Sequence, residues 1–280
     1  MAVISTGPIS LVSIQNEFGG TNPISLSEYY KSVGYTTSNN SVIPSSGAIS
    51  IGSFHGAVKG FLFNPVISTP VLNYNLSTAA ISAGWDGVMP LLATVTNNST
   101  VGSASTSQYS FVIPPLPAGS QALLVNQGYI VGCGGSGANV GTTGASGLPG
   151  GPALQIAFAA VIDNNSGVIA GGGGGGASGN YTSAHIFGCG GGGAGYSVGA
   201  GGSWPAGFYN VYGASAATLT TGGVGGTYAG SGGALGAPGG ATGFSEGNGI
   251  LGIGGAAGAA TSGAAMATWI FTGSRLGVVG

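Results

Sequence analysis

Large apolar residues recur at a fixed spacing in three short stretches near the start of the chain. In each stretch an Ile-Ser pair is followed by Leu or Ile, and a large apolar residue comes three positions later. The copies span residues 7–14, 22–29 and 47–54. Because a spacing of three places two side chains on one face of a helical turn, the pattern predicts three short helical turns. Ser25 and Glu28 have the capping-box spacing, which predicts that the second copy begins a helix.

Each of these copies is too short to bury its own apolar face. The sequence therefore predicts that the copies pack on one another or on a partner protein, and it leaves this choice open. We assign residues 1–60 to an N-terminal module.

Residues 61–127 contain little glycine and carry strand signals. Residues 91–96 and 109–113 are rich in β-branched and aromatic residues, which favour strands. Residues 114–120 form a proline-rich turn cluster, and residues 121–125 read as a returning strand. We predict a small antiparallel β module here. Asp86 precedes Gly87, a pair typical of turns, so a turn role is favoured over a functional one.

From residue 128 onward the apolar residues are small and glycine dominates. Of the 62 glycines, 50 lie in residues 128–280, whereas an ordinary domain contains about 7% glycine. Disordered chains are polar and highly charged, but this chain has 43% hydrophobic and 3% charged residues. Collagen is excluded because no strict Gly-X-Y period runs through the segment. A fold in which glycine itself forms the regular structure remains.

Extended left-handed helices with three residues per turn would satisfy these constraints. Such helices lack internal hydrogen bonds, and buried backbone groups must find partners. Without side chains, neighbouring helices can approach closely enough to bond laterally. The glycine runs of suitable length are Gly132–Gly137, Gly171–Gly176, Gly188–Gly195, Gly222–Gly226, Gly230–Gly236 and Gly252–Gly258. The predicted fold is thus mostly irregular or β, ending in a sandwich of polyglycine II helices with end loops over residues 128–280.

Charge and length exclude several classes of protein. The net charge is −2 with only three basic residues, which offers no patch for nucleic acid or an anionic membrane. The first residues lack the basic and apolar regions of a signal peptide, and no apolar run is long enough to cross a membrane. Cys133 and Cys189 both lie in Gly-Cys-Gly-Gly; two buried thiols are favoured over a disulfide. His55 and His185 are too few additional ligands for a metal site.

Large side chains return where the glycine runs are interrupted. Tyr and Trp offer large contact areas at low entropic cost, which suits binding loops; the alternative is that these aromatics only cover the outer glycine layers. The candidate binding residues are Trp204, Phe208, Tyr209, Tyr212, Tyr196, Tyr181, Tyr228 and Phe244. The final stretch, residues 267–277, predicts a capping strand, with Arg275 in a structural rather than a binding role.

The N-terminal motifs resemble a module common in bacteriophage tail proteins. The motifs are residues 7–11, Phe18-Gly19-Gly20, residues 23–30, residues 43–50 and Phe54-His55-Gly56-Ala57. The resemblance implies a place in the virion tail and attachment to another tail protein. The residues that we assign to attachment are Ile9, Leu11, Ile24, Leu26, Tyr29, Ile49 and Phe54.

The C-terminal part resembles the distal adhesin of T-even-like long tail fibres. The motifs are residues 150–156 and residues 164–170, which run into Gly171–Gly176. In that family a polyglycine-helix sandwich carries hypervariable loops that bind a host surface receptor. The N-terminal module departs from that family's pattern.

These observations predict a phage adhesin rather than an enzyme. The expected partners are a host outer-membrane protein or glycan and another tail protein, with no cofactor, metal or nucleic acid. A catalytic carboxylate pair has only Asp163 and Glu246 to draw on beyond residue 128. A structural fibre or baseplate component is the main alternative, but it would gain nothing from the aromatic cluster between residues 196 and 221. A glycine-rich antifreeze protein would lack the tail module. We further expect the protein to be made in the host cytoplasm and to be located in the virion. It is expected to be present either as a homotrimer or as one copy on a trimeric fibre.

Overall fold

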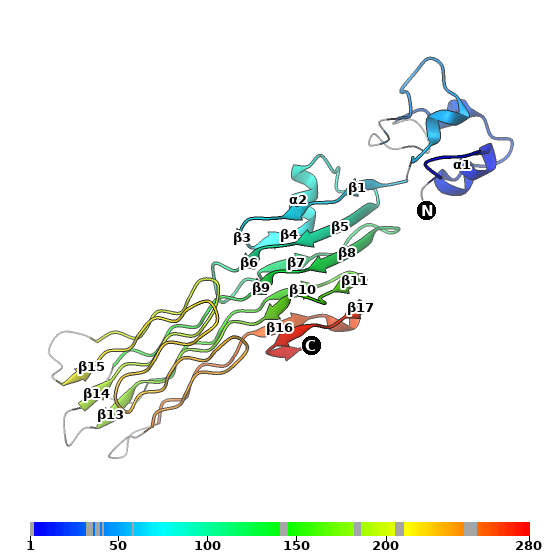
Figure 1. Ribbon diagram of the computed structural model, residues 1–280. Coiled ribbons are helices and arrows are strands. Elements are labelled where there is room, and N and C mark those ends of the chain that lie inside the picture. Colours follow the sequence, from blue (N-terminus) through cyan, green and yellow to red (C-terminus); the bar gives the residue numbers. More distant parts are fainter. Residues whose placement is uncertain are drawn as a thin grey trace. The chain divides into compact units, whose positions relative to one another are not determined.

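The computed structural model describes residues 3–31, 36, 40, 42–57, 59–140, 145–181, 186–204, 210–243 and 251–280 (Figure 1). Contacts divide the chain into two compact units. The first comprises Met1–Asn64, Ala80–Thr94 and Leu116–Ala122, and the second comprises Pro65–Ala79, Val95–Pro115 and Leu123–Gly280.

Three short helices form where the N-terminal repeat predicts them. They are α1 (Leu11–Phe18) and two 3-10 helices, Leu26–Tyr29 and Ile51–Phe54. A serine occupies the N-cap of each. Ser25 caps the second helix by accepting a hydrogen bond from the Ser27 N–H at 3.3 Å, rather than from Glu28 as the capping box predicts.

The three copies pack on one another around a shared core. Ile14, Tyr29 and Phe54, the last residues of the three repeats, are fully buried in it together with Phe18. The rings of Phe18, Tyr29 and Phe54 lie 6.1–6.3 Å apart, centroid to centroid. The repeats thus bury their apolar faces within the module, one of the two alternatives that the sequence leaves open.

The strands of residues 61–131 pair in parallel, so the predicted antiparallel module is wrong. The last five of the nine strands in this segment are β5 (Leu91–Asn97), β6 (Thr100–Gly102), β7 (Phe111–Ile113), β8 (Gln121–Asn126) and β9 (Tyr129–Val131). The strand β8 does not return along β7 but joins the sheet of β5, while β9 pairs in parallel with β6. Alternation and turn signals identify strands without specifying their partners, which explains the error.

Successive strands belong to three different sheets in turn, so the chain winds as a coil with three sides. One sheet has the order β1-β5-β8-β11-β17 with β2 beside β5, and the others have the orders β3-β6-β9-β12-β18 and β4-β7-β10-β16-β19. The remaining bounds are β1 (Phe61–Phe63), β2 (Val66–Ile67), β3 (Val71–Leu72), β4 (Tyr74–Asn75), α2 (Leu76–Ser82), β10 (Leu154–Ile156), β11 (Ala160–Asp163), β12 (Val168–Ala170), β16 (Ala259–Ser262), the 3-10 helix Ala264–Met266, β17 (Ala267–Phe271), β18 (Ser274–Leu276) and β19 (Val278–Val279). The strands β17 and β18 form in the predicted terminal stretch and β19 follows it; each of the three ends one sheet.

A row of buried asparagines connects successive turns of this coil. Asn97, Asn126 and Asn164 are at most 1% exposed. The Asn97 Nδ2 donates to Asn126 Oδ1 at 2.8 Å, and the Asn126 Nδ2 donates to Asn164 Oδ1 at 2.7 Å. The Asn164 Nδ2 in turn donates to the Thr272 carbonyl at 2.8 Å. Side-chain amides stack here because each both donates and accepts.

Two stretches of the chain lie outside these three sheets, one between β9 and β10 and one between β12 and β16. The glycine-rich segments lie in these two stretches. In residues 172–177 the direction of hydrogen-bond donation repeats every three residues. The N–H groups of Gly172 and Gly175 donate to the carbonyls of Gly151 and Leu148, respectively. Those of Gly173 and Gly176 donate to Ala194 and Gly191, and those of Gly174 and Ala177 donate to Ala237 and Gly240. The N···O distances are 2.7–3.0 Å.

The carbonyls of the same segment accept from three further segments with the same period. The donors are the N–H groups of one pair of residues from each segment: Gly258 and Gly255 from the first, Gly135 and Ala138 from the second, and Gly233 and Gly230 from the third. The segment is therefore bonded through its backbone to six neighbours. Residues 189–196 show the same arrangement: successive N–H groups donate in turn to residues near 135, 230 and 215. A β-strand, whose bonding groups alternate between two sides, cannot do this.

Candidate functional site

The centre of the glycine-rich part has no room for side chains. A Cβ added to Gly174 would lie 1.9 Å from the Gly255 carbonyl oxygen, and one added to Gly193 would lie 2.0 Å from that of Gly173. Both distances are far below any real Cβ contact. Large side chains are therefore confined to the outer surfaces and the ends of the segments.

Several segments end beside one another at the end of this part that carries β13 (Gly179–Tyr181), β14 (Ile186–Gly188) and β15 (Val211–Tyr212) (Figure 1). Backbone hydrogen bonds connect the segment ends. The bonds run from Val140 to Ser203, from Ser178 to Ala145, from Phe187 to Asn210 and from Gly243 to Tyr228. Four connections of the chain, between residues 140 and 145, 181 and 186, 204 and 210, and 243 and 251, thus start and end within one hydrogen-bonded framework.

Two exposed aromatic residues, Trp204 and Tyr212, come from neighbouring stretches of backbone at this end. Trp204 is 49% exposed and Tyr212 is 48% exposed. A Cβ added to Gly213 would lie 3.4 Å from the Trp204 ring, so the indole covers the backbone next to Tyr212. Aromatic side chains left half in water on a framework this rigid are suited to contact another molecule.

Tyr228 contributes a third exposed aromatic in an unusual backbone conformation. It is 40% exposed and has φ +64°, in the left-handed region that disfavours residues other than glycine. Its carbonyl accepts the Gly243 N–H at 3.0 Å, a bond that helps hold the turn. Such strained positions cluster at binding sites.

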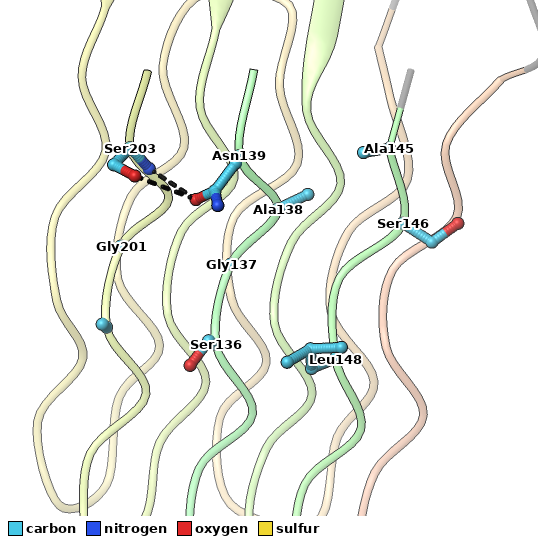
Figure 2. A pocket seen from close by; sticks show the side chains of 10 residues that line it. Ser136, Gly137, Ala138, Asn139, Ala145, Ser146, Leu148, Gly201 and Ser203 are labelled. Atoms are coloured by element: carbon cyan, nitrogen blue, oxygen red, sulfur yellow. Dashed lines mark hydrogen bonds between the residues drawn. The ribbon is translucent and has the colours of Figure 1, made fainter. Parts of the chain in front are cut away.

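A groove of 510 Å³ lies beside these segment ends (Figure 2). Small and uncharged residues line it, among them Ser136, Asn139, Ser146, Leu148 and Ser203. The Asn139 Oδ1 accepts from both the N–H and the hydroxyl of Ser203, at 2.8 and 3.2 Å. These bonds fix the amide at the rim.

Comparison with known proteins identifies the family. Residues 62–280 match the family model of the phage tail fibre adhesin Gp38. The chain belongs to this family of phage tail fibre adhesins. Membership places the adhesin in the phage tail fibre.

A solved structure extends the similarity to the N-terminal module. The adhesin is similar to a chain in the crystal structure of the gp37-gp38 adhesin tip complex of the bacteriophage S16 long tail fiber, with 26% identity, a TM-score of 0.54 and coverage of 99% of both chains. This corrects the expectation that the N-terminal module departs from the family. The comparison with curated proteins gave no match.

Of the other predicted binding residues of the adhesin, Tyr196 lies elsewhere in the structure. A Cβ on Gly102 would lie 2.0 Å from the Tyr196 ring, so Tyr196 packs on β6, among the parallel sheets. Phe208, Tyr209 and Phe244 lie outside the described residues, as does the side chain of Tyr181. Their binding role stays a prediction.

The residues assigned to attachment all belong to the N-terminal core. Tyr29 and Phe54 are fully buried, and Ile9, Leu11, Ile24, Leu26 and Ile49 are partly buried against them. Tyr29 and Phe54 therefore shape the module, and only the partly buried set can touch a partner of the adhesin.

The reactive side chains of the adhesin have structural surroundings. Cys133 and Cys189 are free and buried, and burial raises the pKa of both thiols. Arg275 lies 4.6 Å from the Trp269 ring centroid in a cation–π contact, which the sequence did not indicate. The Asp86 carboxylate accepts from the N–H groups of Val88 and Met89 at 2.9 Å, the turn role expected for it.

The described residues contain neither a candidate membrane span nor a cluster of metal ligands. No helix there has the length and apolar character needed to cross a membrane. No three His, Cys, Asp or Glu side chains gather there as metal ligands.

Proposed function

We propose that the adhesin binds a host cell-surface receptor through the loops at the β13–β15 end, and that a sandwich of polyglycine II helices holds these loops in place. The observation that carries the proposal is the pair of half-exposed aromatics, Trp204 and Tyr212, on a framework without internal side chains. The role is adhesive and non-catalytic, and a host outer-membrane protein or glycan is the expected receptor.

The hydrogen-bond period supports the polyglycine helices. A helix with three residues per turn turns each N–H about 120° from the last, so three donors and three acceptors reach six neighbours. Residues 172–177 and 189–196 bond in this way. Because both segments are saturated with backbone bonds, the scaffold can remain fixed while the loops vary.

The N-terminal module is the proposed attachment to another tail protein. Support comes from the S16 relative, whose structure is described as a gp37-gp38 complex and covers 99% of this chain. The module has its own core, composed of residues 3–57, so it can dock as a preformed unit.

Adsorption of the purified adhesin to susceptible cells tests the receptor-binding end. We expect the double substitution Trp204→Ala with Tyr212→Ala to abolish adsorption and to leave thermal unfolding nearly unchanged, because both side chains are half in solvent. Phe271→Ala is the matched control: Phe271 is 52% exposed but lies on β17, and its removal should preserve adsorption. Undiminished adsorption of the double variant would instead favour a structural tail component without receptor contact through these residues.

A further inference from the structure

Ser178 lies where the glycine-rich bonding pattern ends and the loops begin. Every third N–H group from residue 172 onward donates to the segment of residues 145–151, and the Ser178 N–H ends this series at the Ala145 carbonyl, at 2.9 Å. The Ser178 side chain adds a second bond, because its Oγ accepts the Ala145 N–H at 2.8 Å. The strand β13 begins at the next residue. Ser178 thus joins the base of β13 to the end of the connection between residues 140 and 145.

The Ser178 carbonyl is in turn bonded to the side chain of Thr242. Thr242 Oγ1 lies 2.8 Å from the Ser178 carbonyl oxygen and 3.1 Å from that of Gly252, so its single hydroxyl hydrogen is shared between the two acceptors. The Thr242 N–H also donates to the Gly252 carbonyl, at 3.1 Å. Because Thr242 and Gly252 lie on the two sides of the connection between residues 243 and 251, Thr242 closes the base of this connection and joins it to Ser178.

A third side chain extends this set of bonds to the connection that follows Trp204. Asn139 precedes the connection between residues 140 and 145, and its Oδ1 accepts from the N–H and the hydroxyl of Ser203 (Figure 2). Ser203 directly precedes Trp204. The side chains of Asn139, Ser178 and Thr242 therefore bond the bases of all four connections at the β13–β15 end to one another.

These bonds lie beneath the loops rather than on their surface. Ser178 is 1% exposed, so it cannot touch a receptor itself, and Thr242 is half-buried. A binding surface keeps its geometry only when the residues that support it are themselves fixed by packing and hydrogen bonds. We infer that Ser178 and Thr242 are positioning residues for adhesion, which hold four separate connections as one composite binding surface. The inference rests on the proposed receptor-binding role of this end of the adhesin.

Substitutions that remove one hydroxyl test this role. Thr242→Val keeps the branched shape of the side chain and removes its bonds to Ser178 and Gly252, whereas Thr242→Ser keeps the hydroxyl. Ser178→Ala removes the side-chain acceptor of the Ala145 N–H at a position that no receptor can reach.

Thr218→Val is the matched control. Thr218 is exposed, and its Oγ1 accepts the Thr221 N–H at 3.0 Å. The carbonyls of Tyr212 and Thr218 accept from Cys189 and Gly195, at opposite ends of one neighbouring segment. The control therefore removes the same hydroxyl from the end of the glycine-rich part that lies away from the loops.

Binding is measured to outer-membrane vesicles from susceptible cells, and thermal unfolding is recorded for every variant. We expect Thr242→Val and Ser178→Ala each to bind on the order of tenfold more weakly, the effect of losing one or two hydrogen bonds. Thr242→Ser and Thr218→Val should bind normally. The unfolding temperature should change by no more than a few degrees in any variant. Should Ser178→Ala fail to fold, the two Thr242 variants decide the question.

Undiminished binding of Thr242→Val would overturn the inference, as would undiminished binding of a folded Ser178→Ala. An equal loss in Thr242→Ser would also overturn it, because the hydroxyl would then not be what matters, and an equal loss in Thr218→Val would indicate a general loosening of the scaffold. The proposed function is tested separately by Trp204→Ala with Tyr212→Ala. If that variant binds the vesicles as the unaltered adhesin does, the receptor-binding role fails, whatever the effect of the hydroxyls.

Discussion

A single methyl group is enough to disturb the glycine-rich part at the residue scale. At Gly174 the added carbon would overlap the Gly255 carbonyl, and both groups belong to backbone that is bonded on several sides. Neither segment can move away without breaking its other hydrogen bonds. The usual penalty for glycine in regular structure is therefore reversed here: glycine is the one residue that fits.

We predict that Gly174→Ala lowers the free energy of unfolding by about 1–3 kcal/mol or more, the range seen for overpacked cores. Gly243→Ala is the matched control, because Gly243 is exposed and its added Cβ would approach no atom closer than 3.7 Å. That change should stay within about 0.5 kcal/mol. Denaturant unfolding of both variants measures the difference, and equal stability of the two would contradict the close packing.

At the scale of elements, the asparagine row joins strands that are far apart in sequence. Asn126 both donates to Asn164 and accepts from Asn97. Its removal leaves a buried amide donor and a buried amide oxygen without that partner, and each such loss costs about 1–3 kcal/mol.

Asn126→Ala should therefore destabilise the protein by about 2–4 kcal/mol, through unpaired polar groups and a small cavity. The exposed Asn165, next to the last member of the row, supplies the control: Asn165→Ala keeps the backbone N–H that donates to Asp163 at 3.1 Å and should be nearly neutral. Thermal unfolding compares the two. A mild effect of Asn126→Ala would mean that water replaces the row.

Sequence reasoning succeeded for elements whose cause is local. The Ile-Ser spacing predicted three short helical turns because the residues that define each turn lie within four positions. The density of glycine predicted lateral backbone bonding because no side chain competes. The same reasoning failed to predict the parallel coil, because β8 pairs with β5 and β11, which are distant in sequence, and no local signal indicates these partners. Asn97, Asn126 and Asn164 each precede another Asn or a Gln, a spaced signal that could have indicated the row. Tyr196 was grouped with Trp204 by proximity in sequence, although it packs against β6.

For the whole molecule, attachment and adhesion depend on separate sets of residues. The proposed attachment surface lies within residues 9–54, and its core contains no residue beyond Ala57. The proposed receptor contacts, Trp204 and Tyr212, are held by backbone bonds among glycine-rich segments. No described side chain is shared between the two sets, so substitutions in one should leave the other's binding intact.

This separation predicts reciprocal phenotypes in assembled particles. Phage carrying Trp204→Ala with Tyr212→Ala should incorporate the adhesin at the normal level but adsorb poorly, because the module of residues 3–57 is unchanged. Phage carrying Val12→Glu, Ser27→Glu and Gly52→Glu together should lose the adhesin from the particle, while the same purified variant still adsorbs to cells through its intact loops. Quantitative immunoblots of purified particles and adsorption assays measure both properties. If the loop variant were also missing from particles, or the charged variant failed to adsorb as free protein, the two functions would not be carried by separate surfaces.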